Sequence, residues 1–229
     1  HEANITIIAN GGGFSYGPLG MSHHTTEDLA ILRSLPNISV VAPCTANEAG
    51  EAITAMIKNG GTGYLRLDKT GAKDCFSEDP FVIGKSRRYK EGKDITLIAT
   101  GSILGDANTA SVELKKLGID ARVVGMHSIK PIDVDEIIDA ATNTGGIVTI
   151  EEHNKDGGLG SAISEVCMDL GIIPGKFLRI GLENKYSSIV GSQQYLRSRY
   201  DMDSKAIINK VKKILNSWKQ FKTDVENYD

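Results

Sequence analysis

At 229 residues, 40% of them hydrophobic and 24% charged, the chain has the composition of an ordinary globular protein with one large core or two modest ones. A formal net charge of −3 argues against general binding of nucleic acid or acidic membranes, and no apolar run reaches the ~18–20 residues of a membrane span. The first residues lack the basic and apolar regions of a signal peptide. Cys44, Cys75 and Cys167 are isolated, without the spacing of a metal site or a disulfide framework, so we expect a cytoplasmic protein in which they are buried or half-buried side chains.

The first third of the chain predicts strands and helices in strict alternation. Five short elements are expected, with strands at residues 5–9, 38–42 and 63–67 and helices at 27–34 and 46–58. Thr25 with Asp28, and Thr45 with Glu48, have the spacing of capping boxes, which place the two helix starts. The order implies parallel strands joined by right-handed crossovers. Because three strands cannot hide both faces of such a sheet, we expect a missing upstream segment or a partner to complete it.

A long glycine-rich loop, GGGFSYGPLGMSHH at residues 11–24, joins the first strand to the first helix. Glycine is common where the backbone adopts conformations that other residues avoid, or lies close against a ligand. The loop places His23 and His24 at the expected helix start, where unpaired amides and the helix dipole favour an anionic or polarised ligand. A neutral His23 could donate a hydrogen bond to a carbonyl or alkoxide there. Adjacent histidines also occur as plain surface residues, so both interpretations stay open.

Turn-forming sequence interrupts this rhythm after residue 70. We predict a linker between two domains, with one strand near residues 81–83. The basic run KSRRYK at residues 85–90 could be a phosphate or nucleic-acid patch, or a solvated face of the linker. The run is short and interleaved, which favours the solvated face.

A second α/β unit begins near residue 93. Strands are expected at residues 95–100, 121–126, 146–150 and 177–180, with helices at 106–117, from 133, at 157–170 and at 205–215. The predicted fold class is therefore α/β, with two three-layer α/β/α units whose sheets are mainly parallel and the first of which is truncated at its N-terminus. The expected domains are residues 1–72 and 93–217, with a linker at 73–92 and a tail at 218–229 that frays or docks on a neighbouring subunit.

Glu151, Glu152 and His153 follow a strand of the second unit, where α/β sheets place ligand sites. They could bind a metal or carry out acid–base chemistry, or they could be polar groups at an interface. No partners at metal-ligand spacing accompany them, which favours the interface. His127 has a similar position and is no more decisive. The glycines at residues 157–160 lack the spacing of a dinucleotide-binding loop, which favours close packing of a helix on the sheet.

Several runs of the sequence resemble the transketolase family. The family's D-G-x-T-H-Q loop is resembled by GMSHHTTEDLA at residues 20–30. The elements that follow this loop in the family are resembled by LR at 32–33, LPN at 35–37, VV at 40–41 and NE at 47–48. The second unit resembles the family's C-terminal domain in four short runs, namely TGS at 100–102, IKPID at 129–133, EH at 152–153 and GGLG at 157–160. The chain is most similar to the separately encoded C-terminal subunits, which share the GGGFSYG and SHH-T-ED style of loop.

This resemblance implies thiamine diphosphate chemistry, in which a two-carbon ketol unit passes between sugars or sugar phosphates. In the family the diphosphate and Mg²⁺ are held by one domain and the pyrimidine by another, so both cofactors are expected mainly on a partner subunit or a missing region. The expected partner is an N-terminal thiamine-diphosphate-binding transketolase subunit in a homo- or hetero-oligomer. The substrate is then a small sugar, with neither nucleic acid nor membrane as a partner, and this chain alone is expected to be inactive.

Four residues are candidates for the site under this resemblance. His23 matches the family's loop histidine, which contacts the cofactor's reactive region and the substrate's oxygens. His24 beside it is a candidate substrate contact. Arg66 and Lys69 both lie near the family's phosphate-binding arginine, and the register leaves both open.

Two departures from the family weaken ordinary pentulose-phosphate specificity. Leu19 stands where transketolases have an aspartate that reads a sugar hydroxyl, and Gly11 where they have a phosphate-contacting histidine. Alternative functions are a β component of a 2-oxoacid dehydrogenase, a deoxyxylulose-phosphate-synthase-like protein, or an assembly module without an active site. The run SHHTTED favours the transketolase branch over the other two enzymes.

Overall fold

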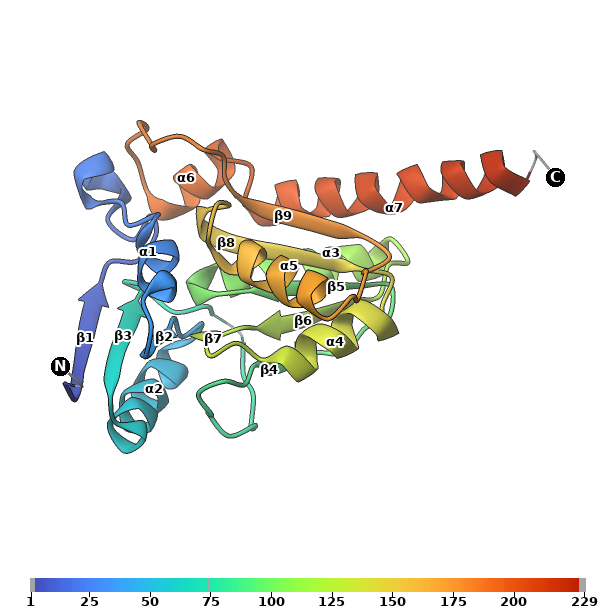
Figure 1. Ribbon diagram of the computed structural model, residues 1–229. Coiled ribbons are helices and arrows are strands. Elements are labelled where there is room, and N and C mark those ends of the chain that lie inside the picture. The colour runs from blue at the N-terminus through green and yellow to red at the C-terminus, as the bar shows by residue number, and fades with distance from the viewer. Residues whose placement is uncertain (1–2, 74, 227–229) are drawn as a thin grey trace.

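The computed structural model describes residues 3–73 and 75–226, with side chains as far as Asn216. Two sheets lie beside each other, and the last helix extends away from the second of them (Figure 1). Within the described residues, seven α-helices form, namely α1 (Asp28–Ser34), α2 (Ala46–Asn59), α3 (Leu104–Lys116), α4 (Val134–Asn143), α5 (Leu159–Asp169), α6 (Gln193–Arg199) and α7 (Ser204–Glu226). Three short 3-10 turns accompany them, η1 (Gly17–Leu19), η2 (Met21–His23) and η3 (Gly101–Ile103).

The first sheet has the strand order β1-β3-β2-β7. Its strands are β1 (Ile5–Asn10), β2 (Ile38–Val41), β3 (Thr62–Leu67) and β7 (Ser128–Lys130). β1, β3 and β2 are parallel, as predicted, whereas β7 comes from the second half of the chain and runs antiparallel to β2. Since successive residues of a strand point to opposite faces, Val41 and Leu65 pack under α2, while Val40 and Tyr64 belong to the core on the α1 side.

The second sheet has the order β4-β6-β5-β8-β9. Its strands are β4 (Arg87–Lys90), β5 (Ile95–Ala99), β6 (Ala121–Gly125), β8 (Ile147–Asn154) and β9 (Phe177–Leu182). β4 is antiparallel to β6, and the other neighbours are parallel. Leu97 packs with α3 and α7 on one face, and Ile98 packs with α4 and α5 on the other. The predicted class of two α/β units with mainly parallel sheets is confirmed.

One hydrophobic core joins the two units. Leu29 of α1 is fully buried in the same cluster as Ile137 of α4 and Ile163 of α5. Burying a leucine side chain of this kind stabilises a fold by about 1.5–3 kcal/mol. Lys130 on β7 adds a polar link, because its Nζ donates to the carbonyl of Arg33 at 2.9 Å. The two sheets are therefore held together by shared packing as well as by the chain itself.

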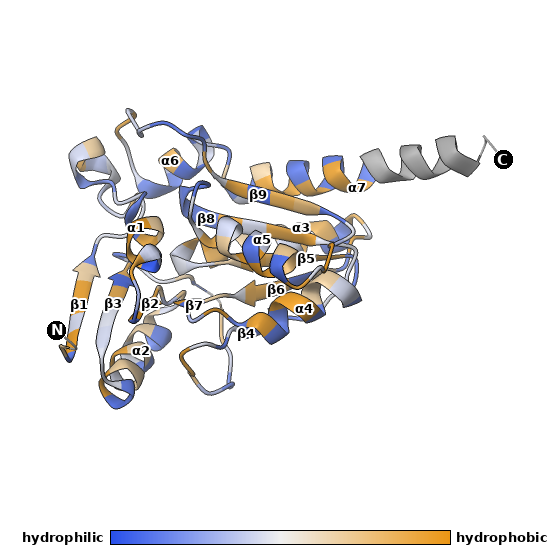
Figure 2. Cartoon of the chain, viewed as in Figure 1, coloured by the Kyte–Doolittle hydropathy of each residue, from blue (hydrophilic) through white to orange (hydrophobic). Residues whose placement is uncertain are grey.

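β1 forms the outer edge of the first sheet and pairs only with β3 among the described strands. Its Ile5, Ile7 and Ile8 are each about half exposed, and the strand carries the hydrophobic colour along that edge in Figure 2. An apolar edge of this kind is uncommon on a monomer surface. The observation agrees with the expectation that another segment or a partner covers the first sheet, which stays a prediction.

The strand expected at residues 81–83 is wrong, because the strand of this region is β4 at Arg87–Lys90. The prediction that the basic run at residues 85–90 is a solvated face is also wrong for Arg87. This residue is 3% exposed and pairs with Glu51 of α2. Arg88 points to the other side and pairs with Glu136 of α4. The acidic partners sit on helices distant in sequence, so the local run gave no sign that its arginines would be paired. The boundary predicted at residue 93 stays a prediction, although the second sheet takes its edge strand from within the predicted linker.

The two predicted capping boxes have different outcomes. Thr45 caps α2, with its Oγ1 accepting from the Glu48 amide at 3.2 Å, as expected. The Thr25–Asp28 box is wrong, because the cap position of α1 is Glu27 without a side-chain hydrogen bond. Asp28 instead accepts from the hydroxyl of Tyr64 at 2.7 Å. A buried partner on β3 thus outcompetes the local cap.

The C-terminal region differs from the prediction in two ways. α6 was not expected, and α7 continues to Glu226 rather than ending near residue 215. The side chains of the predicted docking tail at 218–229 lie outside the described residues. Cys44 and Cys167 are buried and Cys75 is half-buried, and none of the three forms a disulfide within the described residues. None of the described helices has the length and apolar character of a membrane span.

Candidate active site

The carboxyl ends of strands from both sheets meet at one place. The amides of Gly11 and Gly12, just after β1, donate to the carbonyl of Leu67 at the end of β3, at 2.7 and 3.0 Å. Asp68, the next residue, accepts from the amide of Ser102 after β5 at 2.7 Å. The carboxyl ends of parallel strands are where α/β proteins place their ligand sites. This junction is therefore the candidate active site.

The glycine-rich loop is closed at its base by a pair of backbone hydrogen bonds. The amide of Gly13 donates to the carbonyl of Thr25 at 2.9 Å, and the amide of Thr25 donates to the carbonyl of Gly13 at 3.0 Å. Residues 14–24 between them form one loop that contains η1 and η2. Gly13 has a φ of +58°, a left-handed conformation that favours glycine. A side chain at this position would also collide with the carboxylate of Glu152. The expectation that the loop glycines adopt conformations that other residues avoid is confirmed at Gly13. Close approach of the loop backbone to a ligand stays a prediction.

His23 lies on η2 with an exposed side chain. Its Nδ1 is 3.0 Å from the Ser22 hydroxyl, the one hydrogen bond of the ring to a described residue. The expected helix start beside His23 is wrong, because α1 begins only at Asp28 and is seven residues long. The helix-dipole argument therefore does not apply, and what remains is an accessible imidazole at the tip of an anchored loop.

His24 has the opposite environment. Its Nδ1 contacts the Ser187 hydroxyl, and its Nε2 lies 3.2 Å from the carbonyl of Gly17. The ring packs edge-on against Phe14, with centroids 5.3 Å apart. Both ring nitrogens are thus engaged inside the chain, and His24 anchors the loop. Its proposed contact with substrate stays a prediction.

Arg66 and Lys69 occupy different environments after β3. The Arg66 side chain is 5% exposed, and its guanidinium contacts Asp28 at 3.3 Å and donates to the carbonyl of Glu152 at 2.9 Å. Lys69 is exposed, at the mouth of a cavity of about 380 Å³ that Asn10 and Thr45 also line. Of the two candidates for an anionic substrate group, Lys69 is accessible and Arg66 is enclosed by its own chain.

Asp68 sits between these two residues and carries an incompletely satisfied carboxylate. Its Oδ1 is buried without a hydrogen-bond partner among the described residues, and lies 4.0 Å from Nε of Arg66. Burial raises the pKa of Asp68, although Arg66 opposes the shift. Arg66 is therefore a main source of compensating charge for this carboxylate.

Glu151 and His153 are both hydrogen-bonded to backbone groups of the described chain. Glu151 accepts from the amides of Leu159 and Gly160 at 2.7 and 2.9 Å, at the start of α5. His153 donates from Nδ1 to the carbonyl of Asn154 and accepts at Nε2 from the amide of Ala30 on α1. Those two bonds together select the neutral ring with its proton on Nδ1. The interface interpretation, favoured over a metal site, agrees with these contacts.

The remaining motifs also have packing roles. Gly158 leaves room for the side chain of Glu151, and Gly160 lies against Thr149 and Arg179, so the helix can approach the sheet as expected. His127 is fully buried and stacks on Phe81, with ring centroids 4.0 Å apart. Neither feature reaches the candidate active site.

The titration of Glu151 predicts a pH-dependent stability. Burial raises the pKa of Glu151 to about 7, outweighing the two amides that favour its anion. Between about 4.3, its ordinary value, and about 7, the folded chain keeps a proton that the unfolded chain has lost, so the free energy of unfolding falls as pH rises. The wild type should lose about 3–4 kcal/mol relative to Glu151→Gln across this window. Urea unfolding of both proteins at several pH values measures the difference, and a pH-independent difference would contradict the assignment.

His153 must be separated from that effect. Burial lowers the pKa of His153, so its contribution to stability is present above about 6.5 and is lost as pH falls through the lower folded value. This is opposite in sign to the Glu151 contribution. Comparison with Glu151→Gln, which keeps His153, removes the part of this contribution that does not depend on Glu151, whose Oε2 lies 3.8 Å from Nδ1 of His153.

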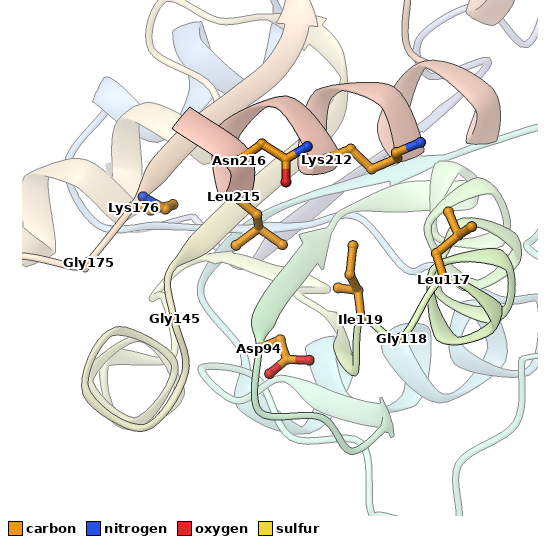
Figure 3. A pocket seen from close by; sticks show the side chains of 10 residues that line it. All are labelled: Asp94, Leu117, Gly118, Ile119, Gly145, Gly175, Lys176, Lys212, Leu215 and Asn216. Atoms are coloured by element: carbon orange, nitrogen blue, oxygen red, sulfur yellow. The ribbon is translucent and has the colours of Figure 1, made fainter. Parts of the chain in front are cut away.

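A second cavity, of about 720 Å³, lies at the other end of the second sheet (Figure 3). Asp94, Gly145 and Lys176 line it from the segments that precede β5, β8 and β9, and Leu215 projects toward it from α7 (Figure 3). These are the amino ends of parallel strands, opposite to the edge where α/β folds bind ligands. We therefore place the candidate active site at the glycine-rich loop.

Sequence reasoning missed the residues that hold the loop from α6 and the segment before it. Gln193 and Arg197 contact Glu152, and Ser187 contacts His24. The short helix has a usual start signal, since Ser192 caps it through the amide of Tyr195. That cap was the one available sign, because the segment carries neither a motif nor clear periodicity.

Comparison with known proteins decides the family. Residues 1–73 match the model of the transketolase pyrimidine binding domain, and residues 84–207 match that of the transketolase C-terminal domain.

The chain belongs to the transketolase family.

Three relatives illustrate that membership. One subunit of an apulose-4-phosphate transketolase from Phocaeicola vulgatus is 34% identical over 208 residues, which cover 90% of this transketolase-family chain and 65% of the relative. A 1-deoxy-D-xylulose-5-phosphate synthase 1 from Geobacter metallireducens is 34% identical over 199 residues, which cover 86% of this chain and 32% of the synthase. A solved split-gene transketolase, described as an inactive beta4 tetramer, superposes with a TM-score of 0.81 at 35% identity, covering 94% of this chain and 67% of that one. The chain thus spans about two thirds of the transketolase subunits that it matches.

Proposed function

We propose that this chain is the C-terminal part of a thiamine-diphosphate-dependent transketolase-like enzyme. It transfers a two-carbon ketol unit between sugars or sugar phosphates, and it acts with a partner subunit or an upstream region. The observation that carries the proposal is the exposed imidazole of His23, on a loop fixed where the carboxyl ends of both sheets meet. Membership of the transketolase family and the apulose-4-phosphate transketolase relative support the same reaction.

Each candidate residue has a distinct role in this proposal. His23 donates a hydrogen bond to the substrate's oxygens as negative charge develops on them in the transition state. Preorganised contacts of this kind usually contribute most to lowering the activation barrier of an enzymatic reaction. Lys69 binds an anionic group of the substrate from its exposed position, and His24 completes the substrate wall beside Ser187. Arg66 compensates Asp28 and Asp68 beneath the loop.

Thiamine diphosphate fits this assignment as a group shared between chains. When bound, it supplies the carbon nucleophile and electron sink that break and form the carbon–carbon bond. His23 would contact its reactive region from an open surface, where the neighbouring side chains of Leu19 and Met21 are apolar and more than half exposed. Within the described residues, no three His, Cys, Asp or Glu side chains are placed to hold a metal ion, and we name no Mg²⁺ ligand on this chain.

The proposed partner is an N-terminal thiamine-diphosphate-binding transketolase subunit, in a cytoplasmic oligomer. The exposed isoleucines of β1 give such a partner an apolar surface to cover. The apulose-4-phosphate transketolase relative, itself one subunit of its enzyme, and the tetramer of the split-gene relative support an enzyme divided between chains. A second candidate reaction, the condensation carried out by deoxyxylulose-phosphate synthases, rests on the relative of that name.

The test combines the full-length protein and its partner subunit with thiamine diphosphate, Mg²⁺ and a panel of ketose donors with an aldose acceptor. Ketol transfer should require both chains and the cofactor. A parallel arm with pyruvate as donor detects the synthase reaction by release of carbon dioxide. Normal assembly without transfer from any ketose would contradict the proposed function.

A further inference from the structure

The buried carboxylate of Glu152, at the carboxyl end of β8, connects the second unit to the glycine-rich loop. Its side chain is 3% exposed. Oε2 accepts from the amide of Phe14 at 3.0 Å and from Nε2 of Gln193 at 2.9 Å. Oε1 accepts from Nε of Arg197. The backbone carbonyl of the same residue accepts from Arg66, so Glu152 contacts the loop and its support from two sides.

Arg197 on α6 is itself fixed in place. Its Nη1 pairs with Asp106 of α3 at 2.8 Å, and its Nη2 donates to the hydroxyl of Ser102 at 2.7 Å. The arginine side chain is 8% exposed. Charge-assisted bonds of this kind in a low-dielectric interior are stronger than neutral ones. Glu152 is therefore held by a rigid set of partners within the second unit. Among the described residues, the Phe14 amide is its one hydrogen-bond donor from the glycine-rich loop.

Further contacts from the second unit reach the same loop. Phe14 is fully buried and stacks on Tyr200, with centroids 5.4 Å apart. The amide of Gly191 donates to the carbonyl of Gly17 at 3.3 Å. The turn formed by η1 and η2 lies beside the segment that leads into α6 (Figure 1). The loop is thus shaped largely by groups outside the unit to which it is covalently attached.

We propose that Glu152 is a positioning residue that sets the conformation of the loop carrying His23, so that the C-terminal domain controls the geometry of a site to which it gives no reacting group. The loop contains many glycines, whose backbone is freer than that of other residues. The bond to the Phe14 amide fixes it directly after the left-handed Gly13. A displacement of the order of 1 Å in a catalytic group costs about 10²-fold in rate. The effect on catalysis rests on the proposed function, whereas the effect on the loop does not.

The first test measures hydrogen exchange of the full chain, comparing Glu152→Gln with the wild type. Glutamine keeps the size of the side chain but removes the negative charge of the Glu152 carboxylate, which accepts from both Arg197 and the Phe14 amide. Amides in residues 14–24 should exchange at least about tenfold faster, since one charged hydrogen bond accounts for that ratio. Amides of β5 and α3 should keep their wild-type rates. Unchanged rates in the loop, or an equal increase throughout the chain, would overturn the proposal.

Glu151→Gln is the matched control. Glu151 is the adjacent residue, is equally buried, and binds the start of α5 without touching the loop. Its variant should leave exchange in residues 14–24 at the wild-type rate. If Glu152→Gln does not fold, Gln193→Met removes one donor to Glu152 from a half-buried position. That variant should accelerate exchange in the loop by a smaller factor, and wild-type rates there would overturn the proposal.

The second test measures kinetics in the complex with the partner subunit. Glu152→Gln should lower kcat about 10²-fold and leave KM for the ketose within about threefold, as expected for a misplaced transition-state contact. A raised KM with wild-type kcat would overturn the positioning role. If the wild-type complex shows no ketol transfer, the proposed function fails, and the exchange experiment still decides the role of Glu152 in the loop.

Discussion

Replacing His23 by alanine should lower kcat/KM of the assembled enzyme by about 10²–10³-fold, the usual loss for one preorganised donor at a reacting oxygen. The same change should alter the free energy of unfolding by less than about 0.5 kcal/mol, as for other surface substitutions. The structural reason is that the ring is exposed and that its one hydrogen bond among the described residues is to the neighbouring Ser22 hydroxyl. Steady-state kinetics with the best ketose donor and a thermal melt of each protein measure the two quantities.

His24→Ala is the informative control for that experiment. It removes contacts to Ser187 and Gly17 and the edge-on packing against Phe14, so it should destabilise the loop as well as reduce activity. His23→Ala should reduce activity alone. Wild-type kinetics for His23→Ala would exclude this histidine from the site and would leave the loop with a purely structural role.

The regular elements were predictable because their signals are local. Strands such as β5 and β6 are short apolar runs, and α2 begins at the expected Thr45. β7 could not be predicted in the same way, since its three residues form a strand only because the edge of β2 accepts them. β4 was obscured by its charges, which are satisfied by acids on α2 and α4.

The candidate site was predictable to a similar extent. The glycine-rich loop and its His23 could be recognised as a candidate site, because so many glycines are unusual in a loop between a strand and a helix. The anchors were not, since Glu152 and Arg197 lie far from the loop in sequence and meet it only when the sheets pack together. The different environments of Arg66 and Lys69 were also not predictable, because they depend on which side chain the second unit covers.

Replacing Arg66 by methionine should destabilise the chain by about 3–5 kcal/mol, the usual cost of removing one member of a buried charged group. The change leaves Asp28 and Asp68 without the guanidinium that lies between them. Asp68 already has one buried oxygen without a hydrogen-bond partner among the described residues, so it has no obvious replacement. Urea unfolding at neutral pH measures the loss. A variant as stable as the wild type would contradict this account of Arg66.

Lys69→Met completes the comparison, because it removes a cation three residues away without uncovering a buried charge. Its side chain is exposed, so the free energy of unfolding should change by less than about 0.5 kcal/mol. KM for a phosphorylated ketose should instead rise about 10- to 100-fold, the value of one charge-assisted hydrogen bond, with little change for an unphosphorylated donor. If Arg66→Met were stable and lost this discrimination while Lys69→Met kept it, the two assignments would have to be exchanged. The pair of variants thus separates the cation that compensates Asp28 and Asp68 from the cation that we propose to bind the substrate.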